Sequence, residues 1–209
     1  MRGLFITFEG ADGCGKSTQL KFLAQFLEQN NVSVVCTREP GGSPIAEKIR
    51  GILLDKENLE MNAVTETLLY AAARAEHVRK VVRPALDAGK VVLCDRFIHS
   101  SYAYQGFGRG LGVKLVRRLN KRALDNCMPD ITIFINISPE RAFERMNELK
   151  QRDRLESESL EFHRRVFNGF IKISKSKGVI SIDAKGSKRQ THELIIQKLM
   201  PVIRKAGLI

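Results

Sequence analysis

Residues 10–17 read Gly10-Ala11-Asp12-Gly13-Cys14-Gly15-Lys16-Ser17 and fit the pattern GxxxxGK(S/T) of a phosphate-binding loop. An apolar, β-rich run at residues 3–8 precedes the motif, and a helical pattern begins inside it and continues over residues 16–29. A strand, a glycine-rich loop and a helix in this order form the setting in which the motif binds nucleotides. The motif therefore predicts an α/β nucleotide-binding fold.

The positions of this loop suit the chemistry of a nucleotide site. Glycines let backbone N–H groups approach phosphate oxygens, and the helix N-terminus adds a favourable partial charge. Lys16 can reach the β- and γ-phosphates, and the Ser17 hydroxyl can ligate Mg²⁺. The motif indicates ATP or GTP, but the string at residues 120–123 lacks the Asp of an NKxD guanine motif, which disfavours a GTPase. The residues expected around the phosphates are Gly10, Ala11, Asp12, Gly13, Cys14, Gly15, Lys16, Ser17 and Thr18.

The composition is that of a folded globular protein with an excess of positive charge. The chain has 209 residues, of which 43% are hydrophobic and 28% charged, and its formal net charge is +12. These values disfavour disorder and predict one large domain over residues 1–209. The excess charge indicates an anionic partner; nucleic acid, an acidic membrane surface and small phosphorylated molecules all qualify.

Some classes of protein are disfavoured by patterns that the sequence lacks. No window approaches the roughly 18–20 apolar residues of a membrane span, and the run at residues 3–8 is too short for a signal peptide. The four cysteines form no CxxC pair, so neither a zinc site nor a disulfide framework is indicated. We expect a protein of the reducing cytoplasm that is not associated with a membrane.

Apolar runs and helical patterns alternate along the chain. Strands are expected at residues 3–8, 32–37, 90–94, 131–137 and 179–182. Helices are expected at residues 16–29, 45–54, 63–86, 114–124, 139–149, 160–174 and 193–204. The strands lack polar alternation, as expected when helices cover both of their faces. The pattern predicts an α/β fold with a five-stranded parallel sheet flanked by helices.

Charged residues follow the second and third expected strands. Arg38 and Glu39 come after one, and Asp95 and Arg96 after the other. The carboxyl ends of parallel strands line the ligand crevice of such a sheet, so these residues should face the same crevice as Lys16. Asp95 is placed like the acidic residue that holds Mg²⁺, directly or through water, in P-loop enzymes.

Six strings stand in order along the chain: FEGADGCGKSTQ at 8–19, REPGG at 38–42, LLYAAARAEH at 68–77, DRFIHSSYAYQG at 95–106, RDRLE at 152–156 and EFHRRVFNGF at 161–170. Together these strings resemble the thymidylate kinases of bacterial type. The resemblance implies a three-layer P-loop fold like that of nucleoside monophosphate kinases. It also implies phosphorylation of dTMP to dTDP with ATP and Mg²⁺, and assembly as a homodimer.

The same resemblance implies which residues hold the sugar and phosphate of the acceptor. Asp12 would contact the 3′-hydroxyl of the sugar. Arg50 and Arg96 would grip the acceptor phosphate, and Glu39, followed by Pro40, would lie near the metal and the acceptor.

A second group of residues would surround the acceptor base. Tyr70 corresponds to a ring, usually Phe, that stacks on thymine. Arg74, four residues further along the same helix face, would contact the thymine edge or the phosphate. Ser101 and Gln105 would line the base, and Tyr104 would pack against the 2′ carbon of the sugar. From the residues alone, core packing of Tyr70, a solvated Arg74 and a turn-capping Gln105 remain open readings.

The basic segment at about residues 145–158 is expected to act as a lid. An acceptor phosphate is mostly dianionic at pH 7, so the reaction requires cations rather than a general base. Some relatives place an arginine inside the P-loop, where this chain has Gly13 and Cys14. The resemblance therefore assigns the transition-state charge to Arg152 or Arg154, oriented by Asp153, beside Lys16 and Arg96.

Two other functions remain as alternatives. The chain could be a P-loop kinase that phosphorylates another nucleoside monophosphate or a deoxynucleoside. It could also be an ATPase that binds nucleic acid, but its basic residues are spread along the chain and it has no Trp. We therefore expect small-molecule substrates, ATP and dTMP, and no nucleic acid.

Overall fold

Five parallel strands form the sheet at the centre of the fold. The computed structural model describes residues 2–138, 140–142, 144 and 153–209. The strands are β1 (Phe5–Glu9), β2 (Val34–Arg38), β3 (Val91–Asp95), β4 (Ile131–Asn136) and β5 (Val179–Asp183). They lie in the order β2-β3-β1-β4-β5, and every adjacent pair is parallel. The expected five-stranded parallel sheet is confirmed.

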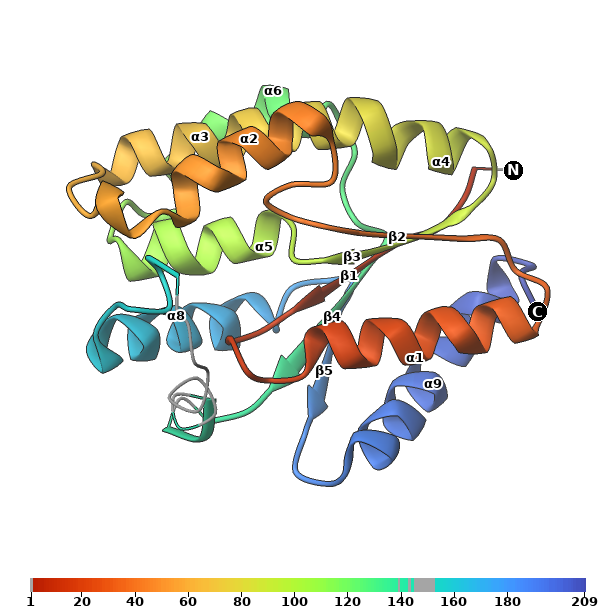
Figure 1. Ribbon diagram of the computed structural model, residues 1–209. Helices are drawn as coiled ribbons and strands as arrows, with labels where there is room; N and C mark the ends of the chain where they lie inside the picture. The colour runs from red at the N-terminus through yellow and green to blue at the C-terminus, as the bar shows by residue number, and fades with distance from the viewer. Residues whose placement is uncertain (1, 139, 143, 145–152) are drawn as a thin grey trace.

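Helices cover both faces of this sheet (Figure 1). Their bounds are α1 (Lys16–Gln29), α2 (Pro44–Leu54), η1 (Lys56–Asn58), α3 (Ala63–His77), η2 (Val78–Val82), α4 (Arg83–Asp87), α5 (Ile98–Ser101), η3 (Tyr102–Gly108), α6 (Val113–Leu124), α8 (Leu160–Ile173) and α9 (Lys188–Lys205). In Figure 1, α1 and α9 lie on one side of the sheet, and α3, α5 and α8 lie on the other. The expected three layers are present.

The strands supply apolar side chains to two separate cores because successive residues point to opposite faces. Phe5 and Phe134 are buried in the core beneath α8 and η3. Ile6 and Ile135, the next residue along each strand, are buried in the core beneath α1 and α9. Burial on both faces explains why the strand sequences lack polar alternation.

Two helical regions differ from the sequence prediction. The helix expected at residues 63–86 follows one path but is divided into α3, the π-helical η2 and α4, with Pro84 in the first turn of α4, where its missing N–H is harmless. Residues 98–108 form α5 and the π-helical η3, which the prediction missed because Gly106 and Gly108 weaken the helical pattern. The helix expected at 139–149 lies largely outside the described residues.

The segment η3 packs closely against α8 because glycines lie at their contact. A Cβ atom on Gly108 would lie 2.8 Å from both Phe162 and Val166, and one on Gly169 would lie 2.7 Å from the Phe107 ring. The close contact holds η3, which carries Tyr104 and Gln105, at a fixed distance from α8.

The described helices include none with the length and apolar character needed to cross a membrane.

Candidate active site

A cavity of about 440 Å³ opens where the carboxyl ends of β2 and β3 meet the phosphate-binding loop. The predicted residues that line it are Asp12, Gly13, Gly15, Lys16, Ser17, Thr18, Arg38, Glu39, Pro40, Arg50, Tyr70, Arg74, Asp95, Arg96, Ser101, Tyr104, Gln105 and Asp153. Leu54, Phe97, Ser100, Leu155 and Glu156 complete the lining. Segments from residue 12 to residue 156 therefore converge on one cavity.

The phosphate-binding loop holds Lys16 between its backbone carbonyls. Lys16 Nζ donates to the carbonyl oxygens of Ala11 (2.8 Å) and Gly10 (3.2 Å), beside Cys14 Sγ. Gly15 has a φ of 98° at the N-cap of α1, a left-handed conformation that glycine adopts without strain. Gly10, Ala11 and Cys14 thus shape the loop without lining the cavity.

Ser17 and Asp95 offer two adjacent oxygen ligands to the cavity. Ser17 Oγ donates to Asp95 Oδ2 at 2.5 Å, which joins the first turn of α1 to the end of β3. A hydroxyl and a carboxylate are oxygen donors of the kind that Mg²⁺ prefers. The donor set therefore fits the predicted metal.

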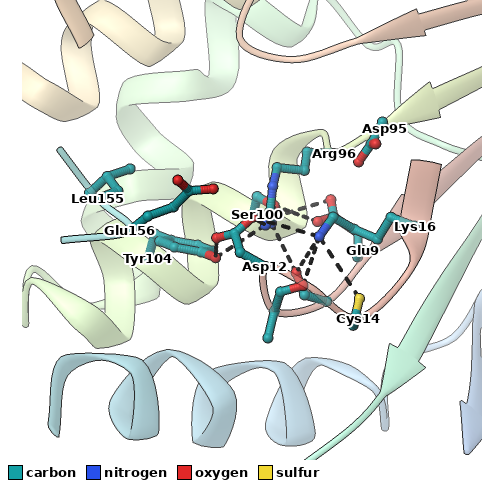
Figure 2. A network of polar contacts seen from close by, with 12 residues as sticks. Glu9, Asp12, Cys14, Lys16, Asp95, Arg96, Ser100, Tyr104, Leu155 and Glu156 are labelled. Carbon is teal, nitrogen blue, oxygen red and sulfur yellow. Dashed lines mark hydrogen bonds and ion pairs between the residues drawn. The ribbon is translucent and has the colours of Figure 1, made fainter. Parts of the chain in front are cut away.

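Arg96 is the hub of the polar network drawn in Figure 2. Its backbone has a φ of 67°, and NH1 donates to Gly10 O (3.0 Å) and Ser100 Oγ (2.9 Å). NH2 donates to Asp12 Oδ1 and lies 3.2 Å from the hydroxyl of Tyr104, and the guanidinium lies 5.1 Å from the centre of that ring. Asp12, Arg96 and Tyr104, three of the residues predicted around the acceptor sugar and phosphate, are thus in direct contact.

The Asp12 carboxylate is held in its charged form by its neighbours. Burial alone would raise its pKa, but the charges of Arg96 and Lys16 and the hydrogen bond from Tyr104 hold the pKa of Asp12 well below its ordinary value. Tyr104 Oη donates to Asp12 Oδ2 at 2.8 Å. Asp12 therefore fixes the direction of both the Arg96 guanidinium and the Tyr104 ring.

Glu9, the last residue of β1, supports this network, and the sequence analysis did not single it out. Its buried carboxylate accepts hydrogen bonds from Phe97 N (2.9 Å), Ser100 N (3.2 Å) and Ser100 Oγ (2.5 Å). Burial raises the pKa of Glu9 to about 7, against the lowering effects of Ser100 and Arg96. These bonds hold the turn in which Arg96 adopts its positive φ.

Arg74 is neither solvated nor free. It is 1% exposed, Nε donates to Glu39 Oε2 (2.9 Å), and NH2 lies 3.1 Å from Ser101 Oγ. His77 Nδ1 lies 3.0 Å from Glu39 Oε1, so two side chains of α3 hold Glu39 at the cavity wall. Arg50 NH1 donates to Pro40 O at 2.8 Å and holds α2 against the same wall.

The part of the cavity lined by Tyr70 and Gln105 is supported by a buried carboxylate, Glu66, that the sequence analysis also missed. Glu66 is fully buried on α3 and accepts hydrogen bonds from Gln105, Arg109 and Arg154. No spacing along the chain signals this cluster, because its members come from α3, η3, the loop after η3 and the segment that precedes α8.

Of the predicted lid residues that the structure describes, Asp153 lines the cavity and Arg154 does not. Arg152 lies outside the described residues. Arg154 is 2% exposed and does not line the cavity: its Nε donates to Leu53 O (2.9 Å) and its NH2 to Glu66 Oε2 (2.7 Å). Asp153 lines the cavity, but its Oδ1 accepts from the backbone of Leu155 and Glu156, so here it caps a turn.

Comparisons with known proteins agree on one family. The model of a family described as thymidylate kinase matches residues 8–195. Thymidylate kinase of Finegoldia magna is 49% identical over 99% of this chain and all of its own length, and that of Bacillus velezensis is 46% identical over 99% and 97%. The crystal structure of thymidylate kinase from Ehrlichia chaffeensis, 33% identical, superposes with a TM-score of 0.77 over 95% of this chain and 100% of its own.

Proposed function

The chain belongs to the thymidylate kinase family, and we propose that its cavity transfers the γ-phosphoryl group of ATP to dTMP, giving dTDP and ADP. The observation that carries this proposal is that the phosphate-binding loop and the wall formed by Tyr70, Arg74 and Gln105 line the same cavity. A donor phosphate held by the loop and a base held by that wall would place the two phosphates next to Arg96.

The reaction needs no general base, because a phosphate monoester has a second pKa of about 6 and is mostly dianionic at pH 7. The difficulty is the repulsion between two polyanions. Lys16 from the loop and Arg96 from the end of β3 direct positive charge into the cavity, and Arg50 adds a third cation at its rim. Fixed charges of this kind stabilise the transferring phosphoryl group without reorganising during the reaction.

Ser17 and Asp95 would hold Mg²⁺ in this site. When bound, the ion would neutralise charge on the β- and γ-phosphate oxygens. The backbone N–H groups of the loop and the N-terminus of α1 would bind the same phosphates.

The acceptor would lie between Arg96 and the base wall. Arg96 and Arg50 would bind its phosphate, and Asp12 would accept a hydrogen bond from the 3′-hydroxyl of its sugar. Tyr104, fixed by its bond to Asp12, would pack against the 2′ carbon, where a ribose hydroxyl would collide with the ring.

On the base itself, Tyr70 would stack on thymine, and Ser101, Gln105 and Arg74 would line its edge. Arg74 already forms hydrogen bonds with Glu39, Ser101 and Asn120. It would therefore hold these side chains in place as well as contact the edge of the base.

The lid would supply the remaining transition-state charge. Arg152 and Arg154 were both candidates, but Arg154 would have to leave its buried partner Glu66 to reach the phosphates. Breaking a buried ion pair is costly, so we assign the transition-state cation to Arg152.

A coupled assay of ADP release tests the proposed function. With ATP and Mg²⁺, dTMP should give the highest kcat/KM in a panel with dUMP, dCMP, dGMP and UMP. A clear preference for another monophosphate or for a deoxynucleoside would favour the first alternative. ATPase activity that depends on oligonucleotides would favour the second.

A homodimer is also part of the proposal. Ile45 and Ile52 of α2 and Val64 and Leu68 of α3 are large apolar side chains that are 40–52% exposed, although the two helices pack on each other. Exposed apolar patches are typical of protein interfaces, and large exposed apolar side chains on two adjoining helices support an interface here. Light scattering should give twice the chain mass, and Leu68→Lys should give a monomer. We place such an enzyme in the cytoplasm, without membrane or nucleic-acid partners.

A further inference from the structure

Glu66 lies behind the wall formed by Tyr70, Arg74 and Gln105. It contacts Gln105, the side chain expected to bind the edge of the base. Gln105 Nε2 donates to Glu66 Oε1 at 2.8 Å. Arg109 donates to both oxygens, from Nε at 3.3 Å and from NH2 at 3.0 Å, and Arg154 NH2 donates to Oε2 at 2.7 Å. Glu66 is fully buried, and Gln105 is 1% exposed yet lines the cavity.

The charge state of Glu66 determines which end of the Gln105 carboxamide, the NH₂ group or the oxygen, can form a hydrogen bond with it. Burial would raise the pKa of Glu66, but hydrogen bonds from Arg109 and Gln105 and the charge of Arg109 outweigh burial and lower it below its ordinary value. An ionised carboxylate is only an acceptor, so it binds the NH₂ end of a carboxamide and rejects the oxygen end.

The orientation of Gln105 leaves its carbonyl end available to a ligand. With Nε2 bound to Glu66, Oε1 points away from that carboxylate, and among the described residues no donor to Oε1 is found. A carboxamide that was free to rotate would offer either a donor or an acceptor to the base. A carboxamide tied to an anion offers only the acceptor.

We propose that Glu66 is a positioning residue for base selection: it holds the Gln105 carboxamide so that only a base with an N–H donor at ring position 3 is accepted. This inference rests on the proposed function. Thymine and uracil carry hydrogen on N3, whereas N3 of cytosine is an acceptor that would face Gln105 Oε1 without a proton between them. Two facing acceptors are repelled, and both lose their bonds to water, so a site of this kind rejects the wrong ligand strongly.

The proposal separates cytosine from uracil. Uracil differs from thymine only in the methyl group and keeps N3–H, so Glu66 contributes nothing to discrimination against dUMP. A residue that merely stabilised the fold would change the use of dCMP and dUMP in parallel.

The variant Glu66→Gln tests the proposal because a neutral amide can donate as well as accept, which permits Gln105 to turn. The ratio of kcat/KM for dTMP to that for dCMP should fall by about tenfold to a hundredfold, while the ratio for dTMP to dUMP stays within about twofold of the wild type. The conservative variant Glu66→Asp keeps an acceptor-only anion and should retain the dTMP/dCMP ratio even where its kcat/KM for both falls.

Glu158→Gln is the matched control. Glu158 Oε1 lies 2.5 Å from Arg109 NH1, so this variant also removes one carboxylate from Arg109 but leaves Gln105 and its partner intact. Both ratios should match the wild type in this variant.

An unchanged dTMP/dCMP ratio in folded Glu66→Gln would overturn the proposal, as would equal changes in the two ratios.

Should the single variant fail to fold, the double variant Glu66→Gln, Arg154→Gln removes one buried cation together with the anion. Calorimetric Kd values of that variant for dTMP, dCMP and dUMP give the same comparison. A wild-type enzyme that prefers an acceptor other than dTMP would instead contradict the proposed function, whatever the variants do.

Discussion

The hydroxyl of Ser17 lies 2.5 Å from Asp95 Oδ2, so the first turn of α1 and the end of β3 present two oxygen ligands at one point of the cavity. If Mg²⁺ binds there, Asp95→Asn should raise the Mg²⁺ concentration for half-maximal activity by about tenfold or more, because a neutral amide is a weaker ligand. Titration of activity with Mg²⁺ after EDTA treatment measures this. The same Mg²⁺ dependence in the wild type and the variant would exclude Asp95 as a ligand.

Replacement of Arg96 should affect the acceptor rather than ATP. Arg96→Met is expected to lower kcat/KM for dTMP by about a thousandfold, and Arg96→Lys should recover little because an ammonium cannot bridge Asp12 and a phosphate as the planar guanidinium does. Steady-state kinetics with each substrate varied in turn distinguish the two effects. Arg79→Met, at an exposed position of η2, is the control.

The Tyr104 ring should exclude ribonucleotides by its size. Tyr104→Ala is expected to raise the relative use of UMP over dUMP by about tenfold, because the obstacle at the 2′ carbon is removed. Tyr104→Phe keeps the ring and loses only the contacts of its hydroxyl with Asp12 and Arg96, so its preference should remain near that of the wild type. An unchanged preference in the alanine variant would disprove the steric role.

Loss of Arg154 should affect stability, whereas loss of Arg152 should affect kcat. Arg154→Met removes a buried partner of Glu66 and should lower the free energy of unfolding by about 2–3 kcal/mol, while Arg109 and Gln105 still hold the carboxylate. Arg152→Met should lower kcat more than it raises KM, as expected for a charge that acts in the transition state. Urea unfolding and kinetics on both variants test this. A normal kcat for Arg152→Met would reject the lid assignment.

Glu9 should make stability depend on pH in the direction opposite to that of most carboxylates. Its pKa is about 7 in the folded protein against an ordinary value of 4.5, so the folded state holds the proton more tightly than the unfolded state does. The contribution of protonated Glu9 to the free energy of unfolding is fully present below about pH 4.5. It is lost as the pH rises to about 7, and the loss is on the order of 3 kcal/mol. Glu9→Gln should remove this dependence of stability on pH. Unfolding free energies at pH 5 and pH 8, compared between the two proteins, measure it.

The fold could be predicted from local sequence because its signals are local. An apolar strand, the glycine loop ending in Lys16 and the alternation of strands with helices lie within short windows, and each was found where expected. The π-helical segment η3 was missed because a wide helical turn needs tertiary packing, here against α8, and the glycines that permit this packing suggest a loop when read alone.

The candidate site could be predicted only where residues follow strand ends or resemble known motifs. Asp95 and Arg96 follow β3 directly, so topology brings them to Lys16. Glu66 and Glu9 carry no such signal, because the meaning of a buried carboxylate depends on its partners. The partners of Glu66 lie 39, 43 and 88 positions away, and only the folded chain brings them together.

The glycine contact between η3 and α8 has a consequence for protein engineering. A methyl group at Gly108 or Gly169 would push η3 and α8 apart, because it would lie less than 3 Å from Phe162, Val166 or Phe107. The displaced η3 would carry Tyr104 with it, although neither glycine lines the cavity. Libraries aimed at new acceptors could therefore sample the back of η3 and the facing turns of α8, and so reshape the pocket without altering any residue that touches the substrate.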